Sequence, residues 1–175
     1  MELGSREDME RYDVYKPEKA AGKLSYGRPI VTIMVGLPGS GKSTFAKDLI
    51  YDGVVYISSD EIRDEFFNGE YGKEQNNEVF RIVMERYEKA LQEGKDVVLD
   101  ATHLLEKYRR KYIEKAKEYN GYLIAIYIGV SYTVAYERNL KRDRQVPKDV
   151  IRRMFFDLEP PSHKEGFDEI CIVDE

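Results

Sequence analysis

Short apolar runs alternate with longer amphipathic segments along most of the chain. Between the runs, apolar side chains recur every three or four residues, which is typical of helices that pack one face against a sheet. Strands that alternate with helices at this spacing predict an α/β fold, in which a five-stranded parallel sheet has helices on both faces. The five runs that predict buried strands are residues 30–35, 54–57, 97–99, 122–128 and 170–173.

The predicted helices have recognisable ends. A short helix capped by a serine follows the second strand, and a long helix runs from about Glu74 to Gly94. Ser131 caps a helix that we expect to reach about Arg142, and Pro147 begins the next one. These signals place one or two helices between each pair of successive strands.

The beginning of the chain lacks this pattern. Residues 1–28 are polar, show no clear periodicity and contain Pro17, Gly22 and Gly27 as breakers. We therefore predict an N-terminal extension at 1–28 and one domain at 29–175, which is long enough to bury a sizeable core.

The first strand leads directly into a glycine-rich sequence, GLPGSGKST, and then into a helical pattern. Such a loop wraps a polyphosphate with its backbone N–H groups and the N-terminus of the helix. Its lysine reaches the β- and γ-phosphates, and the serine that follows coordinates Mg²⁺. This strand–loop–helix context predicts a P-loop that binds ATP or another nucleoside triphosphate. The candidate nucleotide-binding residues of the loop are Gly36, Gly39, Ser40, Gly41, Lys42, Ser43 and Thr44.

Two aspartates follow neighbouring stretches of predicted strand. Asp60 comes shortly after the second strand, and Asp100 ends the third strand with Thr102 two residues later. Ligands of parallel α/β sheets bind outside the carboxyl ends of the strands. We therefore expect both aspartates to share one crevice with the P-loop, although Asp60 could instead only cap the short helix.

Composition indicates the redox environment of the protein and excludes some kinds of site. Cys171 is the only cysteine of the 175 residues, so an intramolecular disulfide is excluded and we expect a reduced, cytoplasmic environment. No run is long enough to span a membrane, and no cysteine–histidine cluster indicates a zinc site. The net charge of −5 argues against general binding of nucleic acid, although it allows a local cluster of positive charge.

Such a cluster lies late in the chain. Between Arg138 and Arg153 there are seven basic and two acidic residues. Arg138 and Arg142 are four residues apart and would share one helical face, with Arg144 in a loop just beyond. A positioned arginine stabilises the charge that develops during phosphoryl transfer, so we predict an arginine-bearing helical lid. The alternative is an ordinary solvated helix face.

Three classes of P-loop protein compete: a nucleotide-operated switch, a motor ATPase and a small phosphotransferase. A GTPase switch would carry D-x-x-G after its third strand and N-K-x-D later, whereas here the third strand ends in Asp-Ala-Thr-His and N-K-x-D is absent. A motor ATPase usually has a larger core and assembly surfaces. The chain length and the arginine cluster favour the phosphotransferase.

Several segments, in order, resemble the 5′-hydroxyl polynucleotide kinases, namely the kinase domains of the phage T4 and bacterial polynucleotide kinase–phosphatase family. The resemblance covers about residues 30–173. The P-loop is shared with many kinases, and the combination of S-S-D-x-x-R, D-A-T and E-R-N…R…R-Q-V is more specific. The segments are GLPGSGKSTFAK, VVYISSDEIR, VVLDATH, YERNLKRDRQVPKDVIRRM and HKEGFDEI.

The resemblance implies roles on the acceptor side. Asp60 matches the general base that takes the proton of the attacking 5′-hydroxyl. Arg63, one helical turn further, resembles the arginine that holds a phosphate of the acceptor strand, although it could instead pair on the surface with Asp64 or Glu65.

The resemblance also implies roles around the nucleotide. Arg138, Arg142 and Arg144 resemble lid arginines that engage the ATP phosphates and the transferring group, so Arg138 joins Lys42 and Asp60 in the expected catalytic set. Asp100 matches an acidic residue that holds a Mg²⁺-bound water or orients Arg63.

In the D-A-T-H sequence at residues 100–103, Thr102 accompanies Asp100 as an expected substrate-binding residue. His103 stands where the family usually has asparagine. This departure leaves open whether position 103 contacts the substrate.

The expected activity is therefore transfer of the γ-phosphate of ATP, with Mg²⁺, to the 5′-hydroxyl end of RNA or DNA. We expect a separate ligase or phosphatase partner to perform any sealing or 3′-end processing. A kinase of a small metabolite or nucleoside and a non-catalytic nucleotide-binding regulator remain as alternatives.

Overall fold

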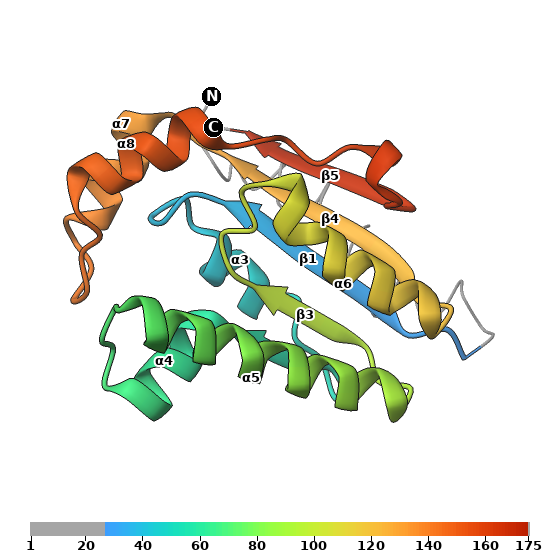
Figure 1. The fold of residues 1–175 in the computed structure, drawn as a ribbon. Helices are drawn as coiled ribbons and strands as arrows, with labels where there is room; N and C mark the ends of the chain where they lie inside the picture. The colour runs from blue at the N-terminus through green and yellow to red at the C-terminus, as the bar shows by residue number, and fades with distance from the viewer. Residues whose placement is uncertain (1–26, 175) are drawn as a thin grey trace.

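In the computed structural model, which describes residues 27–174, the strands form one parallel sheet in the order β2-β3-β1-β4-β5 (Figure 1). Each strand end lies within one residue of the predicted position, and the predicted α/β fold with a five-stranded parallel sheet is confirmed. The strands are β1 Ile30–Gly36, β2 Val55–Ser58, β3 Val97–Asp100, β4 Tyr122–Gly129 and β5 Glu169–Asp174.

Helices cover both faces of the sheet (Figure 1). One face packs against α4, α5 and α6, and the other packs against α3, α7 and α8. The helices are α3 Lys42–Lys47, α4 Ser59–Phe67, α5 Lys73–Gln92, α6 Glu106–Glu118, α7 Tyr132–Asn139 and α8 Lys148–Asp157, with a 3₁₀ turn, η2, at His163–Glu165.

The central strand shows why its sequence is apolar throughout. Val31, Ile33 and Val35 of β1 belong to the core on the α5–α6 side, whereas Ile30 and Met34 belong to the core on the α3–α7 side. All of β1 is buried, because side chains that alternate between the two faces meet helices on both. This rigid strand ends directly at the P-loop.

Helix α7 is shorter than the sequence predicts. It ends at Asn139 rather than near Arg142, because the buried Asn139 side chain bonds the backbone of Val146. Its Nδ2 donates to Val146 O at 2.8 Å, and its Oδ1 accepts from Val146 N at 2.9 Å. These bonds close the base of residues 140–147, here called the lid segment, which extends toward α4 across the carboxyl ends of the strands (Figure 1).

The predicted N-terminal extension falls almost entirely outside the described residues. Of its members, Gly27 and Arg28 are described. The Nε of Arg28 donates to Asn120 O at 2.9 Å, and its Nη2 donates to Gly121 O at 3.2 Å. The division at residue 28 stays a prediction. Among residues 27–174, no helix has the length and apolar character that crossing a membrane requires.

Candidate active site

The P-loop connects β1 to α3, and its glycines are required by geometry. Gly39 has φ +81°, and a Cβ there would lie 2.3 Å from Ala135 O of α7. Gly41, with φ +94°, is the N-cap of α3. Arg138 of α7 donates from Nη1 to Ser40 O at 3.1 Å. Helix α7 therefore packs directly on the P-loop, and Arg138, one of the three predicted lid arginines, contacts the loop.

The loop after β3 is tied to the P-loop as well. The amide of Gly36 donates to Thr102 O at 3.1 Å, where the two parallel neighbours β1 and β3 end. Ser43 and Thr44 lie in the first turn of α3, the former half-buried and the latter exposed. The sequence prediction that these segments meet at one edge of the sheet is consistent with this arrangement.

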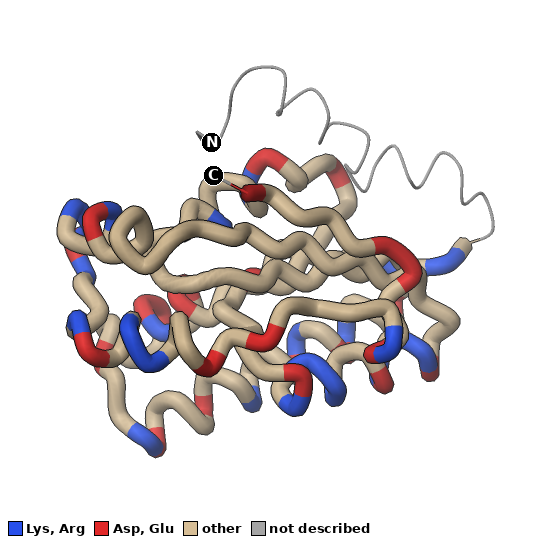
Figure 2. The backbone as a smooth tube through the Cα atoms, turned by 90° about the horizontal axis from the view of Figure 1, so that it is seen from above, with Lys and Arg blue, Asp and Glu red and all other residues tan. Residues whose placement is uncertain are grey.

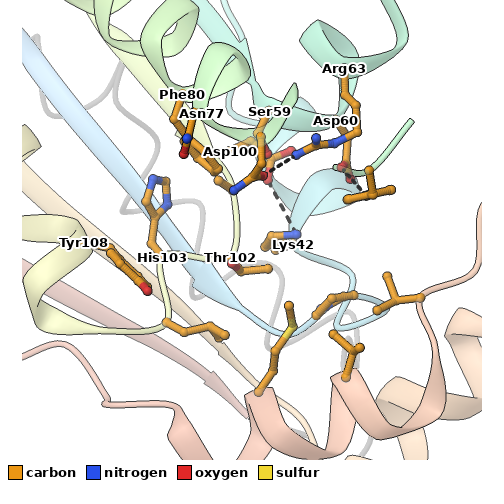
Figure 3. Close-up of a pocket in the computed structure, with 18 of the residues that line it drawn as sticks. Lys42, Ser59, Asp60, Arg63, Asn77, Phe80, Asp100, Thr102, His103 and Tyr108 are labelled. Carbon is orange, nitrogen blue, oxygen red and sulfur yellow. Dashed lines mark hydrogen bonds and ion pairs between the residues drawn. The ribbon is translucent and has the colours of Figure 1, made fainter. Parts of the chain in front are cut away.

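Asp100 lies buried beside the P-loop lysine. Its Oδ1 is 4.0 Å from Lys42 Nζ (Figure 3). Its Oδ2 accepts a hydrogen bond from the Tyr56 hydroxyl. Burial, followed by the charge of Asp100, raises the pKa of Tyr56, so the phenol stays a neutral donor. Tyr56 therefore fixes one oxygen of Asp100 and directs the other toward Lys42.

The residues present fit a magnesium ion. No hydrogen-bond donor among residues 27–174 meets Asp100 Oδ1, although this atom is buried. Together with the Ser43 hydroxyl it offers oxygen ligands, and Mg²⁺ typically takes only one or two from the protein while phosphates and waters complete its shell. Asp100 and Ser43 would hold the ion, and their part in binding it stays a prediction.

Asp60 has a different environment on α4. The cap of this helix is Ser58, whose Oγ accepts from Glu61 N at 3.3 Å, so Asp60 is not needed for capping. Asp60 Oδ1 accepts from the Tyr71 hydroxyl at 3.2 Å, and Oδ2 accepts from Arg142 Nη2 at 3.3 Å. This carboxylate therefore lines the crevice with partners from two loops.

Arg63, one turn further along α4, is buried rather than exposed. Its exposed fraction is 3%, its Nη2 donates to Asn76 Oδ1 at 2.9 Å, and its guanidinium lies 4.1 Å from the centre of the Tyr71 ring. Within the described chain, Nε and Nη1 have no hydrogen-bond partner. A buried guanidinium with unused donors is suited to hold a phosphate.

The other two predicted lid arginines reach α4 from the lid segment. Arg142 contacts Asp60, as described above, and Arg144 forms an ion pair with Asp64 and lies 5.7 Å from the centre of the Tyr71 ring. In the charge-coloured view, basic and acidic positions alternate along the helices and loops around the sheet (Figure 2). Arg138 of α7 therefore contacts the P-loop, whereas Arg142 and Arg144 of the lid segment contact α4, and the role of each arginine stays a prediction.

These side chains surround a pocket of about 870 Å³ (Figure 3). Its polar end contains both aspartates and the residues that could bind phosphates, and its other end is aromatic. The polar end is lined by Lys42, Asp60, Arg63, Asp100, Thr102 and Arg142, and the aromatic end by Phe80, Tyr108 and Tyr112.

His103 lies between the two ends, in a left-handed backbone conformation with φ 45°. Its Nδ1 lies 2.7 Å from Met34 O, and burial lowers the pKa of the imidazole to about 4. The buried Arg109 fixes its backbone, because Nη1 donates to His103 O at 2.8 Å while Nε and Nη2 bind Glu165 at 2.6 and 3.0 Å.

Sequence reasoning missed the residues that support the predicted ones. Tyr71 and Asn76 precede or begin α5 and have no signal in the sequence that pairs them with α4. Tyr56 had a signal: it shares a face of β2 with Ser58, which is aligned with Asp100 in the neighbouring strand. The partners of a strand-end carboxylate could be found once the strand order is known.

Comparison with known proteins places the chain in a family. A family model described as an AAA domain matches residues 31–161, which include the P-loop and the lid arginines. The chain belongs to the AAA-domain family. Its fold is that of a P-loop kinase, and the matched part of this AAA domain covers all the strands except the last.

Two curated relatives match part of this chain. The chain is 26% identical over 151 residues to the L-seryl-tRNA(Sec) kinase of Methanococcus maripaludis, a match that covers 79% of it. It is 30% identical over 129 residues to a protein of Autographa californica nuclear polyhedrosis virus named as a candidate bifunctional polynucleotide kinase/RNA ligase, over 66% of this chain. The matches span 56% and 18% of the lengths of these two relatives.

Solved structures share the fold. A chain of the Pnkp1/Rnl/Hen1 RNA repair complex superposes with a TM-score of 0.67 and 25% identity, over 81% of this chain and 47% of that one. Chaetomium thermophilum Kti12 bound to ADP-AlF3 gives a TM-score of 0.64 at 18% identity, over 82% and 88%. A gluconokinase from Sinorhizobium meliloti gives 0.59 at 23%, over 83% and 82%. The latter two show only that the AAA domain has the P-loop kinase fold.

Proposed function

We propose that this protein is an ATP-dependent polynucleotide 5′-hydroxyl kinase, which acts on the ends of RNA or DNA during end repair. The observation that carries the proposal is the pair formed by Asp60 and Arg63. They lie one turn apart on α4 and both line the pocket that Lys42 enters. A carboxylate that accepts a proton and a buried guanidinium with unused donors suit an acceptor that carries a hydroxyl and a nearby phosphodiester.

The reaction then follows from the positions of these groups. The P-loop and Lys42 hold the polyphosphate of ATP, and Arg138 and Arg142 offset the charge on the transferring group. Asp60 takes the proton of the 5′-hydroxyl as its oxygen bonds to the γ-phosphorus. The bond between that phosphorus and the bridging oxygen breaks, and ADP leaves with the electron pair.

A bound Mg²⁺ would neutralise phosphate charge during this step, next to Ser43 and Asp100. On this basis we expect activity to require the ion and to be lost on its removal by a chelator. A partner that seals or trims the other strand end belongs to the same proposal, and it is supported by the likeness to a chain of an RNA repair complex.

A second candidate is a kinase of another alcohol. It is supported by the match to an L-seryl-tRNA(Sec) kinase, which covers more of this chain than the match to the viral protein. Such an acceptor, or a small metabolite or nucleoside, would use the P-loop, Asp60 and the lid equally well. It would leave the unused donors of Arg63 without an obvious ligand when the acceptor carries no phosphate.

The test is an acceptor screen with γ-labelled ATP. Oligoribonucleotides and oligodeoxynucleotides with a 5′-hydroxyl are compared with seryl-tRNA, gluconate and free nucleosides, and the same oligonucleotides with a 5′-phosphate serve as the matched control. We expect label on the 5′-hydroxyl oligonucleotides and none on the phosphorylated ones. Transfer to another acceptor without transfer to any oligonucleotide would reject the proposal, and no transfer at all would favour a nucleotide-binding regulator.

A further inference from the structure

The aromatic end of the pocket has no part in the proposed chemistry. It is a groove between α5 and α6, lined by Phe80, Tyr108, Lys111 and Tyr112 and bounded by His103. We call these five residues the aromatic groove. The Lys111 ammonium lies 4.9 Å from the centre of the Tyr112 ring and 5.7 Å from that of Phe80, so the groove combines π-faces with a cation. It is continuous with the polar end that holds Asp60.

His103 adds a hydrogen-bond acceptor to this groove. Its Nδ1 faces the carbonyl oxygen of Met34 at 2.7 Å, and because a carbonyl only accepts, Nδ1 carries the hydrogen. The lone pair therefore lies on Nε2, which is buried and has no partner within the described chain. In Figure 3 the ring is directed toward the side of the pocket formed by Asn77 and Phe80.

A buried acceptor of this kind selects its ligand. An imidazole at this depth stays neutral, since burial lowers its pKa to about 4, and Nε2 cannot become a donor at neutral pH. A ligand that fills the groove without offering a hydrogen there leaves a desolvated acceptor unpaired, which is unfavourable. The groove therefore favours a molecule that has a flat apolar surface and also an O–H or N–H group.

We propose that the aromatic groove binds the terminal nucleoside of the acceptor strand, an inference that rests on the proposed function. The base stacks against Tyr108 or Phe80, and His103 Nε2 accepts a hydrogen bond from this nucleoside. The donor is either the ribose 2′-hydroxyl or an amino group of the base. With the 5′-oxygen at Asp60 and the following phosphate at Arg63, the base has the groove as its neighbouring space.

The dimensions and chemistry support a nucleoside over a sugar or an amino acid. Pockets for small molecules typically measure about 300–1,000 Å³, and the 870 Å³ here can accommodate a nucleotide beside the polyphosphate. Bases stack on aromatic side chains with little dependence on sequence, whereas a polyol has no flat π-surface to stack in this way. Lys111 is placed to attract a phosphate of the strand as it leaves the groove.

The experiment compares four 5′-hydroxyl oligonucleotides that differ only in the terminal residue: adenosine, 2′-deoxyadenosine, purine riboside (which lacks the amino group) and an abasic ribose. We expect the abasic end to lower kcat/KM by about 10- to 100-fold, as the loss of one stacked base does elsewhere. We expect either the deoxy or the purine riboside end to lower it by about 10-fold, which identifies the group that His103 accepts from.

Two variants assign the effects to the groove. Asn tolerates the left-handed conformation of position 103 but is too short to present an acceptor where Nε2 lies, so in His103→Asn the difference between the donor-containing and donor-lacking ends should fall to about twofold or less. In Tyr108→Ala the penalty for the abasic end should shrink, whereas the matched variant Tyr108→Phe should retain it. Tyr108 is 53% exposed, so these changes test binding rather than folding.

The outcomes separate this inference from the proposed function. Equal kcat/KM for the abasic and adenosine ends would overturn the groove as a base site. Equal values for the adenosine, deoxy and purine riboside ends would overturn the hydrogen bond to His103. Both results can be obtained only if the enzyme transfers phosphate to some of these 5′-hydroxyl oligonucleotides. Absence of transfer to every oligonucleotide would instead reject the proposed function, and the inference with it.

Discussion

The pocket contains two carboxylates that follow adjacent strands, and the protein holds them in opposite ways. The Asp100 side chain is 1% exposed and is fixed by Tyr56 and by the nearby Lys42, all from the sheet or the P-loop. The Asp60 side chain is 37% exposed, and its partners Tyr71 and Arg142 come from two separate loops.

This difference separates stability from turnover. Around Asp100 and His103, buried polar groups depend on one another, so a substitution there should lower the free energy of unfolding in addition to any effect on activity. Around Asp60, the contacts are partly exposed and individually weak, so a substitution there should mainly lower activity.

The largest expected effect is the loss of turnover in the variant Asp60→Asn. The amide is nearly isosteric but cannot take the proton of the acceptor hydroxyl, so kcat should fall by about 10²- to 10⁴-fold. The affinity for ATP should change by less than about threefold, because no P-loop contact is lost. Transfer of labelled phosphate and equilibrium binding of ATP measure the two quantities.

The matched control for this change is Glu61→Gln, the neighbouring carboxylate on α4. Its side chain is 58% exposed and lies 3.6 Å from Lys47 Nζ, outside the pocket lining. We expect kcat to stay within about twofold of the wild type, as is usual for an exposed ion pair. Equal losses in both variants would mean that α4 has been disturbed and that Asp60 is not the base.

The second prediction concerns the buried side, where Arg109→Met leaves the Glu165 carboxylate without a charged partner. The two side chains are 0% and 2% exposed, so the variant should lose about 3–5 kcal/mol of unfolding free energy in urea. The double variant with Glu165→Met should be more stable than the single one, because no unpaired charge stays buried. A single variant as stable as the wild type would show that this buried ion pair contributes little to the free energy of unfolding.

A third effect is the dependence of stability on pH through His103. Its folded pKa of about 4 lies below the ordinary 6.5, so the unfolded chain takes up the proton first as the pH falls. The contribution is complete above pH 6.5 and is lost toward pH 4, at about 1.4 kcal/mol for each pH unit and about 3 kcal/mol in total.

In His103→Asn this loss should be absent. Lowering the pH from 7.5 to 4.5 should therefore reduce the unfolding free energy of the wild type, measured in urea, by about 2–3 kcal/mol more than that of the variant. Parallel stability curves for the two proteins over this range would show that the imidazole is not held neutral by burial.

The contrast also explains what could be predicted from the sequence. The P-loop, the strands and the ends of β2 and β3 follow from local patterns, because backbone geometry and alternating apolar residues determine them. The convergence of Lys42 and Asp100 needs only the rule that ligands bind at the carboxyl ends of parallel strands. These parts of the fold were predicted to within a residue or so.

The remaining features depend on contacts between distant segments. The end of α7 at Asn139 is set by bonds to Val146 that lie outside the helix pattern. Tyr71 reaches Asp60 from a loop, and Arg109 reaches Glu165 across 56 residues. Propensity and spacing contain no information about such pairs, so the partners that hold each site residue are found only in the structure.

The smallest predicted effect is that of Tyr71→Phe, which separates two functions of one side chain. The hydroxyl donates to Asp60, and partial burial together with that carboxylate raises the pKa of Tyr71, so it remains a donor at neutral pH. Removing this bond should lower kcat by about 2- to 10-fold, in line with one ordinary hydrogen bond, while the ring beneath Arg63 keeps the KM for the acceptor within about twofold. Tyr71→Ala removes the ring as well and should raise that KM in addition. If instead Tyr71→Phe changed only KM, the hydroxyl would serve the acceptor rather than the base, and the orientation of Asp60 would depend on Arg142 alone.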